Sequence, residues 1–307
     1  MKVWIAHEQG LAHIGPLPAE IDIEVYADPA APPPSDPAGV TFWVPPFLGS
    51  GDVVGLAAGM PDLRVIQLLS AGADAWLGRI PAGVTLHDAR GVHDSPTSEW
   101  ILTAVLSSLR RFDDAARAQG EGRWASAELL PTDELAGKRV LIVGAGSIGR
   151  ATAARLAPFE VTITEVARSA RPGVHGVDDL PHLLPSADIV ILIVPLTSET
   201  RGLVDEKFLA AMPDGALLVN AARGPVVQTD ALVAELSSGR LRAAMDVTDP
   251  EPLPPGHPLW TTPNTLITPH TAGSVHGLFG RAYRLAGVQL RRHIAGEPLI
   301  NQVVGDY

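Results

Sequence analysis

The chain has 307 residues and a formal charge of −11, from 23 Lys plus Arg against 34 Asp plus Glu. A composition of 46% hydrophobic and 19% charged residues is typical of a globular protein, and this length predicts about two domains. The acidic balance argues against a nucleic-acid partner, because phosphate backbones are bound by basic patches. The absence of cysteine excludes disulfides, thiolate nucleophiles and cysteine-ligated metal sites.

Targeting and metal signals are also missing from the sequence. The apolar run after Met1 is too short for a signal peptide, and no 18-residue apolar stretch predicts a membrane span. No pair of histidines and acids has metal-ligand spacing, so we expect no metal. The sequence therefore predicts a cytoplasmic protein without a membrane partner.

The first ninety residues consist of short β-branched runs separated by Pro and Gly, which predicts strands and loops. The predicted strands are Val3–Ala6, Ile23–Tyr26, Thr41–Val44 and Arg64–Leu69. Apolar residues then recur at three-to-four spacing and predict one long helix over Thr97–Arg117.

From Lys138 onward, strands and helices alternate, which predicts a doubly wound parallel α/β sheet. The predicted strands are Arg139–Val143, Val161–Val166, Ile189–Val194, Ala216–Val219, Ala243–Val247 and Leu266–Thr268. The predicted helices are Ile148–Leu156, Asp179–Leu184, Glu206–Ala211, Asp230–Ser237 and, near the end of the chain, Ser274–Ile294.

A glycine-rich segment between the first strand and helix of this region fits a dinucleotide-binding fingerprint. Gly144 permits the tight turn, Gly146 lets the backbone approach a pyrophosphate, and Gly149 allows close helix–strand packing. Ser147 and Ile148 open the helix, whose N-terminus favours negative charge. This segment therefore predicts a nucleotide coenzyme.

The end of the next strand decides between the two nicotinamide coenzymes. An NAD site has an acid there to bind the ribose 2′-hydroxyl, but this sequence has Ala167. Arg168 and Arg171 can neutralise a 2′-phosphate, and Ser169 can donate a hydrogen bond to it. NADP(H) is therefore favoured; NAD(H) is the alternative if Glu165, two residues earlier, is the acid.

Three later strands each end in a polar side chain suited to carbonyl reduction. These are Arg223, Glu251 and His270, and the carboxyl ends of parallel strands are where ligands bind. Arg223 can clamp a carboxylate with two hydrogen bonds, and His270 can protonate a developing alkoxide. Glu251 can hold the imidazole and stabilise its charged form. The alternatives are a surface ion pair for Arg223 and a loop carboxylate for Glu251.

Five runs of sequence together resemble the D-isomer-specific 2-hydroxyacid dehydrogenase family. They are Gly137–Gly149, Pro195–Thr200, Asn220–Val227, Asp246–Leu253 and Thr268–His270. The resemblance implies that Arg223 binds the substrate, that His270 is the acid/base and that Glu251 is its partner. It further implies substrate-binding backbone amides at Ser70, Ala71 and Gly72, and coenzyme contacts at Pro195, Thr200, Ala221 and Asp246.

The family also implies the domain organisation. A Rossmann-type dinucleotide-binding domain, 96–273, is expected to be inserted into a smaller flavodoxin-like α/β substrate domain formed by 1–95 and 274–307. The missing acid after the second strand departs from the family pattern and puts NAD preference in doubt. Glu251 replaces the glutamine of formate-oxidising relatives, and Ala71 replaces the lysine of phosphite-oxidising ones, so neither substrate is expected.

The predicted function is therefore hydride transfer between NADP(H) and a 2-oxo acid/D-2-hydroxy acid pair. One alternative is a reductase dedicated to glyoxylate or hydroxypyruvate, and larger apolar 2-oxo acids are also open. Another, of a different class, is a nicotinamide-sensing regulatory module, because fold does not fix function. The family suggests a homodimer, with the apolar Trp100–Leu109 stretch as a candidate interface.

Overall fold

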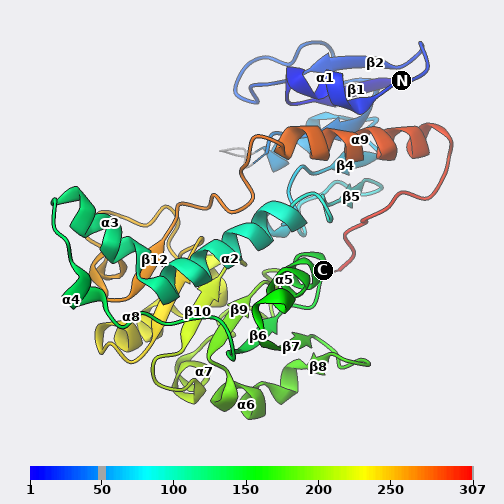
Figure 1. The fold of residues 1–307 in the computed structure, drawn as a ribbon. Coiled ribbons are helices and arrows are strands. Elements are labelled where there is room, and N and C mark those ends of the chain that lie inside the picture. The colour runs from blue at the N-terminus through cyan, green and yellow to red at the C-terminus, as the bar shows by residue number, and fades with distance from the viewer. Residues whose placement is uncertain (48–52, 306–307) are drawn as a thin grey trace. The chain divides into compact units, whose positions relative to one another are not determined.

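The structure is a computed structural model that describes residues 1–47 and 53–305. The chain divides into two compact units, one made of Met1–His93 with Val275–Tyr307 and the other of Asp94–Ser274 (Figure 1). Each unit contains one parallel sheet. Among the described residues, no helix has the length and apolar character needed to cross a membrane.

The unit formed by both ends of the chain has a five-stranded sheet in the order β2-β1-β3-β4-β5. Its strands are β1 (Lys2–Ile5), β2 (Asp22–Val25), β3 (Val40–Val44), β4 (Val65–Gln67) and β5 (Thr85–His87). Its helices are α1 (Leu11–Ile14), α9 (Leu278–Ile294) and the 3-10 turns Glu8–Gly10, Val54–Gly59 and Asp74–Trp76. The strand order is that of flavodoxin-like folds. The four predicted strands are confirmed within two residues, whereas β5 was missed because its pattern is only three residues long.

Alternate residues of these strands supply two separate cores, as the two-residue period of a strand requires. Val3 and Ile5 of β1 join the core that contains Leu278 and Tyr283 of α9, while Trp4 joins the core on the other face. Both faces of the sheet are therefore covered, which is expected for an all-parallel sheet.

The Asp94–Ser274 unit has a seven-stranded sheet in the order β12-β11-β10-β9-β6-β7-β8. Its strands are β6 (Arg139–Val143), β7 (Thr162–Ala167), β8 (His175–Gly176), β9 (Ile189–Leu192), β10 (Leu217–Asn220), β11 (Arg242–Met245) and β12 (Thr265–Ile267). All pairs are parallel, so the predicted Rossmann-type winding is confirmed. Two-residue β8 carries too short a pattern to be recognised from sequence.

The helices of this unit lie on both faces of its sheet (Figure 1). They are α2 (Asp94–Arg110), α3 (Phe112–Gly120), α4 (Ser126–Leu129), α5 (Ser147–Leu156), α6 (Leu180–Leu183), α7 (Glu206–Ala211) and α8 (Thr229–Ser237). The 3-10 turns are Ala157–Phe159, Val177–Asp179, Leu184–Ser186, Gly224–Val226 and Pro258–Thr261. Side chains of α2 and α5 share one core, and those of α6, α7 and α8 share the other.

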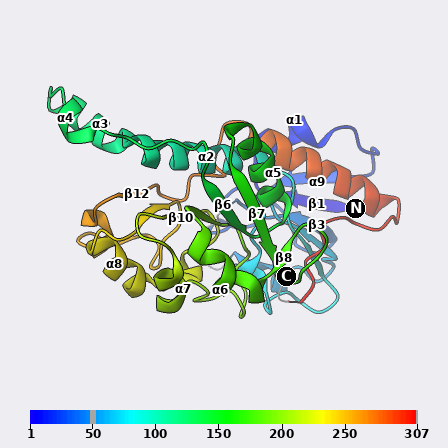
Figure 2. The same cartoon turned by 60° about the horizontal axis from the view of Figure 1, so that its bottom comes forward.

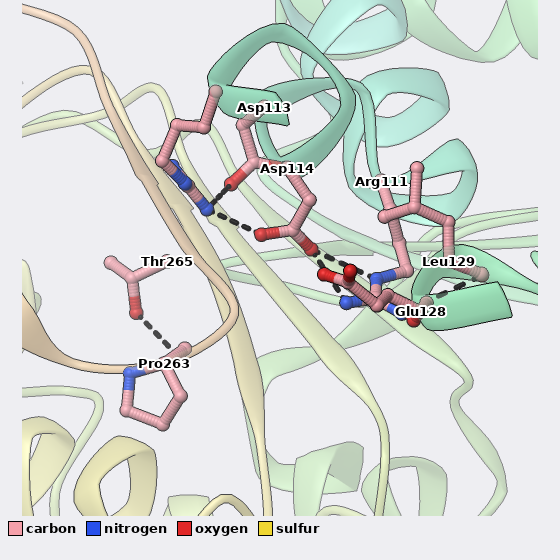
Figure 3. A network of polar contacts seen from close by, with 8 residues as sticks. Arg111, Asp113, Asp114, Glu128, Leu129, Pro263 and Thr265 are labelled. Atoms are coloured by element: carbon pink, nitrogen blue, oxygen red, sulfur yellow. Dashed lines mark hydrogen bonds and ion pairs between the residues drawn. The ribbon is translucent and has the colours of Figure 1, made fainter. Parts of the chain in front are cut away.

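The prediction of one helix over Thr97–Arg117 is wrong. Arg111 adopts a left-handed backbone (φ 53°), which ends α2 and starts α3 in a new direction. Its guanidinium pairs with Asp114 at 2.8 Å and donates to the Glu128 carbonyl at 2.8 Å (Figure 3). These contacts hold the turn, and α3 and α4 extend away from the seven-stranded sheet (Figure 2). Apolar periodicity could not reveal a break that depends on polar contacts.

Candidate active site

The glycine-rich loop joins β6 to α5 with the geometry of an anion-binding turn. Gly144 has φ +123°, and a Cβ there would lie 2.4 Å from the Ile193 carbonyl oxygen. A Cβ on Gly149 would lie 2.0 Å from the Gly144 carbonyl oxygen, so neither position accepts a side chain. A Cβ on exposed Gly146 would instead meet nothing within 4 Å. The open side of the loop is therefore at Gly146, beside the N-terminus of α5, and fits a pyrophosphate.

Side chains around this loop are already ordered by hydrogen bonds. Ser147 Oγ donates to Asp94 Oδ2 at 2.5 Å. Arg171 Nη2 and Arg150 Nη1 both donate to the Ala145 carbonyl, at 2.8 and 3.2 Å. Two guanidinium groups thus lie at the loop, where they add positive charge to that of the helix N-terminus. Ile148 is half-buried in the first turn of α5.

The segment after β7 carries the residues expected to choose the coenzyme. Ala167 is the last residue of the strand, and Glu165 lies within it, paired with Ile142 of β6. Glu165 is therefore not at the strand end, where a ribose-binding acid belongs. Arg168 is exposed and pairs through Nε with Glu199 Oε2 at 3.0 Å. Ser169 follows it and is also exposed.

Glu199 belongs to the loop after β9, which is closed by a hydroxyl. Thr200 Oγ1 donates to the Pro195 carbonyl at 2.6 Å and accepts from Thr197 N at 2.8 Å. These two bonds fix the turn between Pro195 and Thr200, and the turn carries the carboxylate that meets Arg168. Sequence reasoning missed Glu199, although its position in a motif beside the predicted coenzyme site was a usable signal.

Arg223 follows β10 in a loop that its neighbours hold tightly. Fully buried Asn220 accepts from Ala222 N at 3.0 Å and donates from Nδ2 to the Arg223 carbonyl at 3.1 Å. A Cβ on Gly224 would lie 1.9 Å from the Thr248 carbonyl, so this loop packs directly on the backbone that follows β11. Arg223 Nη1 donates to the Ala222 carbonyl at 2.7 Å. Ala221, predicted to contact coenzyme, is half-buried at the start of this loop.

His270 and Glu251 meet in a hydrogen-bonded pair. His270 Nδ1 lies 2.7 Å from Glu251 Oε1, with 29% of the histidine and 42% of the glutamate side chain exposed. A carboxylate only accepts hydrogen bonds, so this contact places a proton on Nδ1. Nε2 forms no hydrogen bond with any of the described residues and is the ring atom available to a ligand.

Asp246 supports the loop that carries His270. Asp246 is buried, with 3% of its surface exposed. Its carboxylate accepts hydrogen bonds from Thr268 Oγ1 at 2.6 Å, Thr271 N at 2.8 Å and Ala272 N at 3.0 Å. The His270 backbone N–H also donates to the Asp246 carbonyl at 2.7 Å. Asp246 therefore acts in this structure as the anchor of the 268–272 loop. Its predicted contact with the nicotinamide stays a prediction.

The three candidate catalytic side chains come from adjacent strands. Arg223 follows β10, Glu251 follows β11 and His270 follows β12, and these strands are neighbours in the sheet. Ser70, Ala71 and Gly72 follow β4 in the other unit, where Ser70 Oγ donates to the Gly72 carbonyl at 2.7 Å. Sequence reasoning missed the supporting residues Asn220 and Thr268. A polar side chain at the end of an otherwise apolar strand is the signal that could have found them.

A small cavity at the other end of the seven-stranded sheet does not belong to this site. It has a volume of about 130 Å³ and adjoins Asp133, Arg242 and Thr265, near the starts of β11 and β12. In the described part of the chain, no group of three or more His, Asp or Glu residues could hold a metal ion.

Comparison with known proteins gives one consistent result. A family model described as D-isomer specific 2-hydroxyacid dehydrogenase, NAD binding domain, matches residues 102–272. A glyoxylate reductase from Thermofilum pendens is 37% identical over 261 residues, which cover 80% of this chain and 76% of that protein.

Two crystal structures resemble the whole chain. A D-isomer specific 2-hydroxyacid dehydrogenase from Xanthobacter autotrophicus Py2, in complex with NADPH and MES, has a TM-score of 0.84, 32% identity and coverage of 99% of this chain and 98% of that one. An NADPH-dependent glyoxylate/hydroxypyruvate reductase from Sinorhizobium meliloti, in complex with NADP and sulfate, has a TM-score of 0.83, 27% identity and 98% coverage of both chains.

Proposed function

The chain belongs to the D-isomer-specific 2-hydroxyacid dehydrogenase family, a family of NAD(P)-dependent oxidoreductases, and we propose that it reduces 2-oxo acids to D-2-hydroxy acids with NADPH. The observation that carries this proposal is the His270–Glu251 pair, whose free Nε2 lies on the sheet edge that also bears Arg223. A nicotinamide-sensing module would not need this acid/base pair. The Asp94–Ser274 unit is then the coenzyme domain, and the unit formed by both chain ends binds substrate.

His270 supplies the proton in this proposal. When the ring is charged, Nδ1 donates its hydrogen bond to Glu251. Nε2 then transfers its proton to the substrate carbonyl oxygen as that oxygen gains negative charge. After transfer the ring is neutral but keeps the Nδ1 proton, so the contact with Glu251 persists through the reaction. In the oxidation direction the same Nε2 accepts the hydroxyl proton.

Arg223 binds and polarises the substrate. Its planar guanidinium can contact a carboxylate and the adjacent carbonyl oxygen, which a lysine ammonium cannot match in geometry. The buried Asn220 contacts and the close approach at Gly224 fix the loop that carries it. We assign the backbone amides at Ser70, Ala71 and Gly72 to the substrate carboxylate, as the family resemblance implies.

The residues of the glycine-rich loop fit a dinucleotide. Gly144, Gly146 and Gly149 form the turn, the open side at Gly146 receives the pyrophosphate, and Arg168, Ser169 and Arg171 would hold a 2′-phosphate. When bound, NADPH supplies the hydride to the carbonyl carbon. Pro195, Thr200, Ala221 and Asp246 are the further proposed coenzyme contacts. NADH is the second candidate coenzyme, and the exposed arginines after β7 favour NADPH over it.

Glyoxylate and hydroxypyruvate are the first substrates to test, because the relatives from Thermofilum pendens and Sinorhizobium meliloti are named as reductases of one or both. The decisive experiment is a spectrophotometric screen of 2-oxo acids with NADPH and NADH in parallel, followed by chiral chromatography of a product that has a stereocentre. We expect turnover with NADPH and a D-product. Coenzyme binding without turnover of any 2-oxo acid would favour the sensing module instead.

We also propose a cytoplasmic homodimer. The α3–α4 extension bears large exposed apolar side chains, with Phe112 60%, Trp124 94% and Leu130 67% exposed, as an interface would require. The Trp100–Leu109 stretch contributes less surface, because Ile101, Ala104, Val105 and Leu109 are buried in the core of their own unit. Sedimentation velocity of the wild type and of Trp124→Ser tests the assembly: a dimer is expected for the first and a shift toward monomer for the second.

A further inference from the structure

Helix α2 is connected to the acid/base loop through one indole. Trp100 Nε1 donates to Thr268 Oγ1 at 3.0 Å, and Thr268 Oγ1 is 2.6 Å from Asp246 Oδ1. We propose that Trp100 and Thr268 are positioning residues that set the orientation of His270 through Asp246. The inference rests on the proposed role of His270 as the acid/base.

The direction of this hydrogen-bond chain is fixed by its two ends. An indole N–H only donates, and a carboxylate that receives two backbone N–H groups only accepts. The Thr268 hydroxyl must therefore accept from Trp100 and donate to Asp246. The Thr268 hydroxyl thus has one allowed orientation and holds its two partners in place. The hydroxyl of an ordinary surface serine or threonine can instead rotate between partners.

The loop beyond Thr268 needs such restraint. His270 has φ +53°, a left-handed conformation that costs free energy for a side-chain-bearing residue and persists only where surroundings impose it. Asp246 imposes it by binding the backbone on the far side of His270, at Thr271 and Ala272. Thr268 binds the same carboxylate from the near side. The histidine is thus held between two attachments to one buried anion.

The same helix also contacts the coenzyme loop. Asp94, in the first turn of α2, accepts a hydrogen bond from Ser147 at the start of α5. Asp94 and Trp100 are six residues apart, which is about 9 Å along a helix. Fully buried Ile101 and Val105 fix α2 on the sheet. Helix α2 therefore acts as a rigid spacer between the loop that would bind pyrophosphate and the loop that carries the acid/base.

Two conservative variants test the proposal in the full-length protein. Trp100→Phe should lower kcat about three- to tenfold, the factor expected from losing one neutral hydrogen bond. Thr268→Val should lower kcat about ten- to hundredfold, because the hydrogen bond that it loses is to a carboxylate. The dissociation constant of NADPH, measured by fluorescence, should change less than kcat does, because Asp246 is only one of the proposed coenzyme contacts and the loop that would bind pyrophosphate is untouched. Thr268→Ser keeps the hydroxyl and should therefore have a kcat close to that of the wild type. The double variant should be no worse than the poorer single one, since both break the same chain.

Measurements other than the reaction rate distinguish residues that position His270 from residues that only stabilise the fold. In both variants the pH profile of kcat/KM and the titration of the His270 ring, followed by NMR, should shift together. Thr103→Val is the matched control and should leave both unchanged, because Thr103 is an exposed residue of the same helix whose hydroxyl donates to the Glu99 carbonyl at 2.8 Å.

Two results would overturn the inference: an unchanged His270 titration in Thr268→Val, or a fall in melting temperature with kcat and pH profile intact. A wild type that turns over no 2-oxo acid would refute the proposed function instead, and the NMR comparison would still decide whether Trp100 and Thr268 orient the ring.

Discussion

The two ends of the seven-stranded sheet use polar side chains in opposite ways. At the amino end, charged groups neutralise one another: Arg139 pairs with Asp188 at 2.9 Å and Lys138 pairs with Asp133 at 2.8 Å. At the carboxyl end, Glu251 holds His270 through Nδ1, and Nε2 forms no hydrogen bond with the described residues. Charge pairing at the amino end is thus a structural feature, whereas at the carboxyl end an oriented side chain with an available atom marks the site.

This difference predicts that substitutions at the carboxyl end alter activity and those at the amino end alter stability. The pKa of Asp188 is lowered, chiefly by hydrogen bonds from the Arg139 side chain, which is the behaviour of a carboxylate with a permanent partner. The following variants test this division, in order of expected effect.

The largest effect is expected for His270→Ala. Without the positioned acid/base, kcat should fall about 10²–10⁴-fold, while NADPH binding is retained. Steady-state kinetics and fluorescence titration measure the two quantities. The control is His182→Ala on α6, an exposed histidine that should change neither. Near-normal turnover by the His270 variant would end the assignment.

Arg223→Lys should come next. It keeps the charge but loses the two-pronged geometry, so KM for the 2-oxo acid should rise about 10- to 100-fold, the value of a charge-assisted hydrogen bond. Initial rates over a range of substrate concentrations give KM. Arg110→Lys, at an exposed arginine that bonds Thr132, is the matched control. An unchanged KM would remove Arg223 from the substrate site.

The coenzyme variants should act in opposite directions. Arg168→Ala should weaken the binding of NADPH about tenfold or more but change the binding of NADH little, because only NADPH carries the 2′-phosphate that the guanidinium would bind. Glu199→Gln should lower the dissociation constant of NADPH up to about fivefold, because it removes the ion pair between Glu199 and Arg168. The effect is small because an exposed ion pair contributes little free energy. Fluorescence titrations with both coenzymes measure these changes. Equal effects on NADPH and NADH would contradict the assignment of the 2′-phosphate site.

The smallest effect is expected at the amino end, for Asp188→Asn. The melting temperature should fall by about 1–3 °C near pH 7 with kcat unchanged, because a partly exposed ion pair stabilises only modestly. A lowered folded-state pKa stabilises the protein above the unfolded pKa of about 3.9, and this contribution is lost as the pH falls below it. The difference in melting temperature between wild type and variant should therefore be constant at pH 5–7 and become smaller toward pH 3.5. A large loss of activity would show that the two ends are not separate in role.

Much of the fold was predictable, because it depends on local patterns. The glycine spacing, the apolar strands of the seven-stranded sheet and the polar residues after them are all visible in sequence, and the parallel winding they predicted is the one observed. The break at Arg111 was not predictable, since a left-handed residue stabilised by Asp114 and Glu128 leaves the apolar period on either side intact.

By itself, the sequence determined which strands end in chemically active side chains, because strand period and glycine placement are properties of neighbouring residues. Only the tertiary structure decided how those side chains are held. The bond of Trp100 to Thr268 joins residues 168 positions apart, and that of Ser147 to Asp94 joins residues 53 apart. Such contacts form only after the sheet and helices have packed, so no local pattern encodes them.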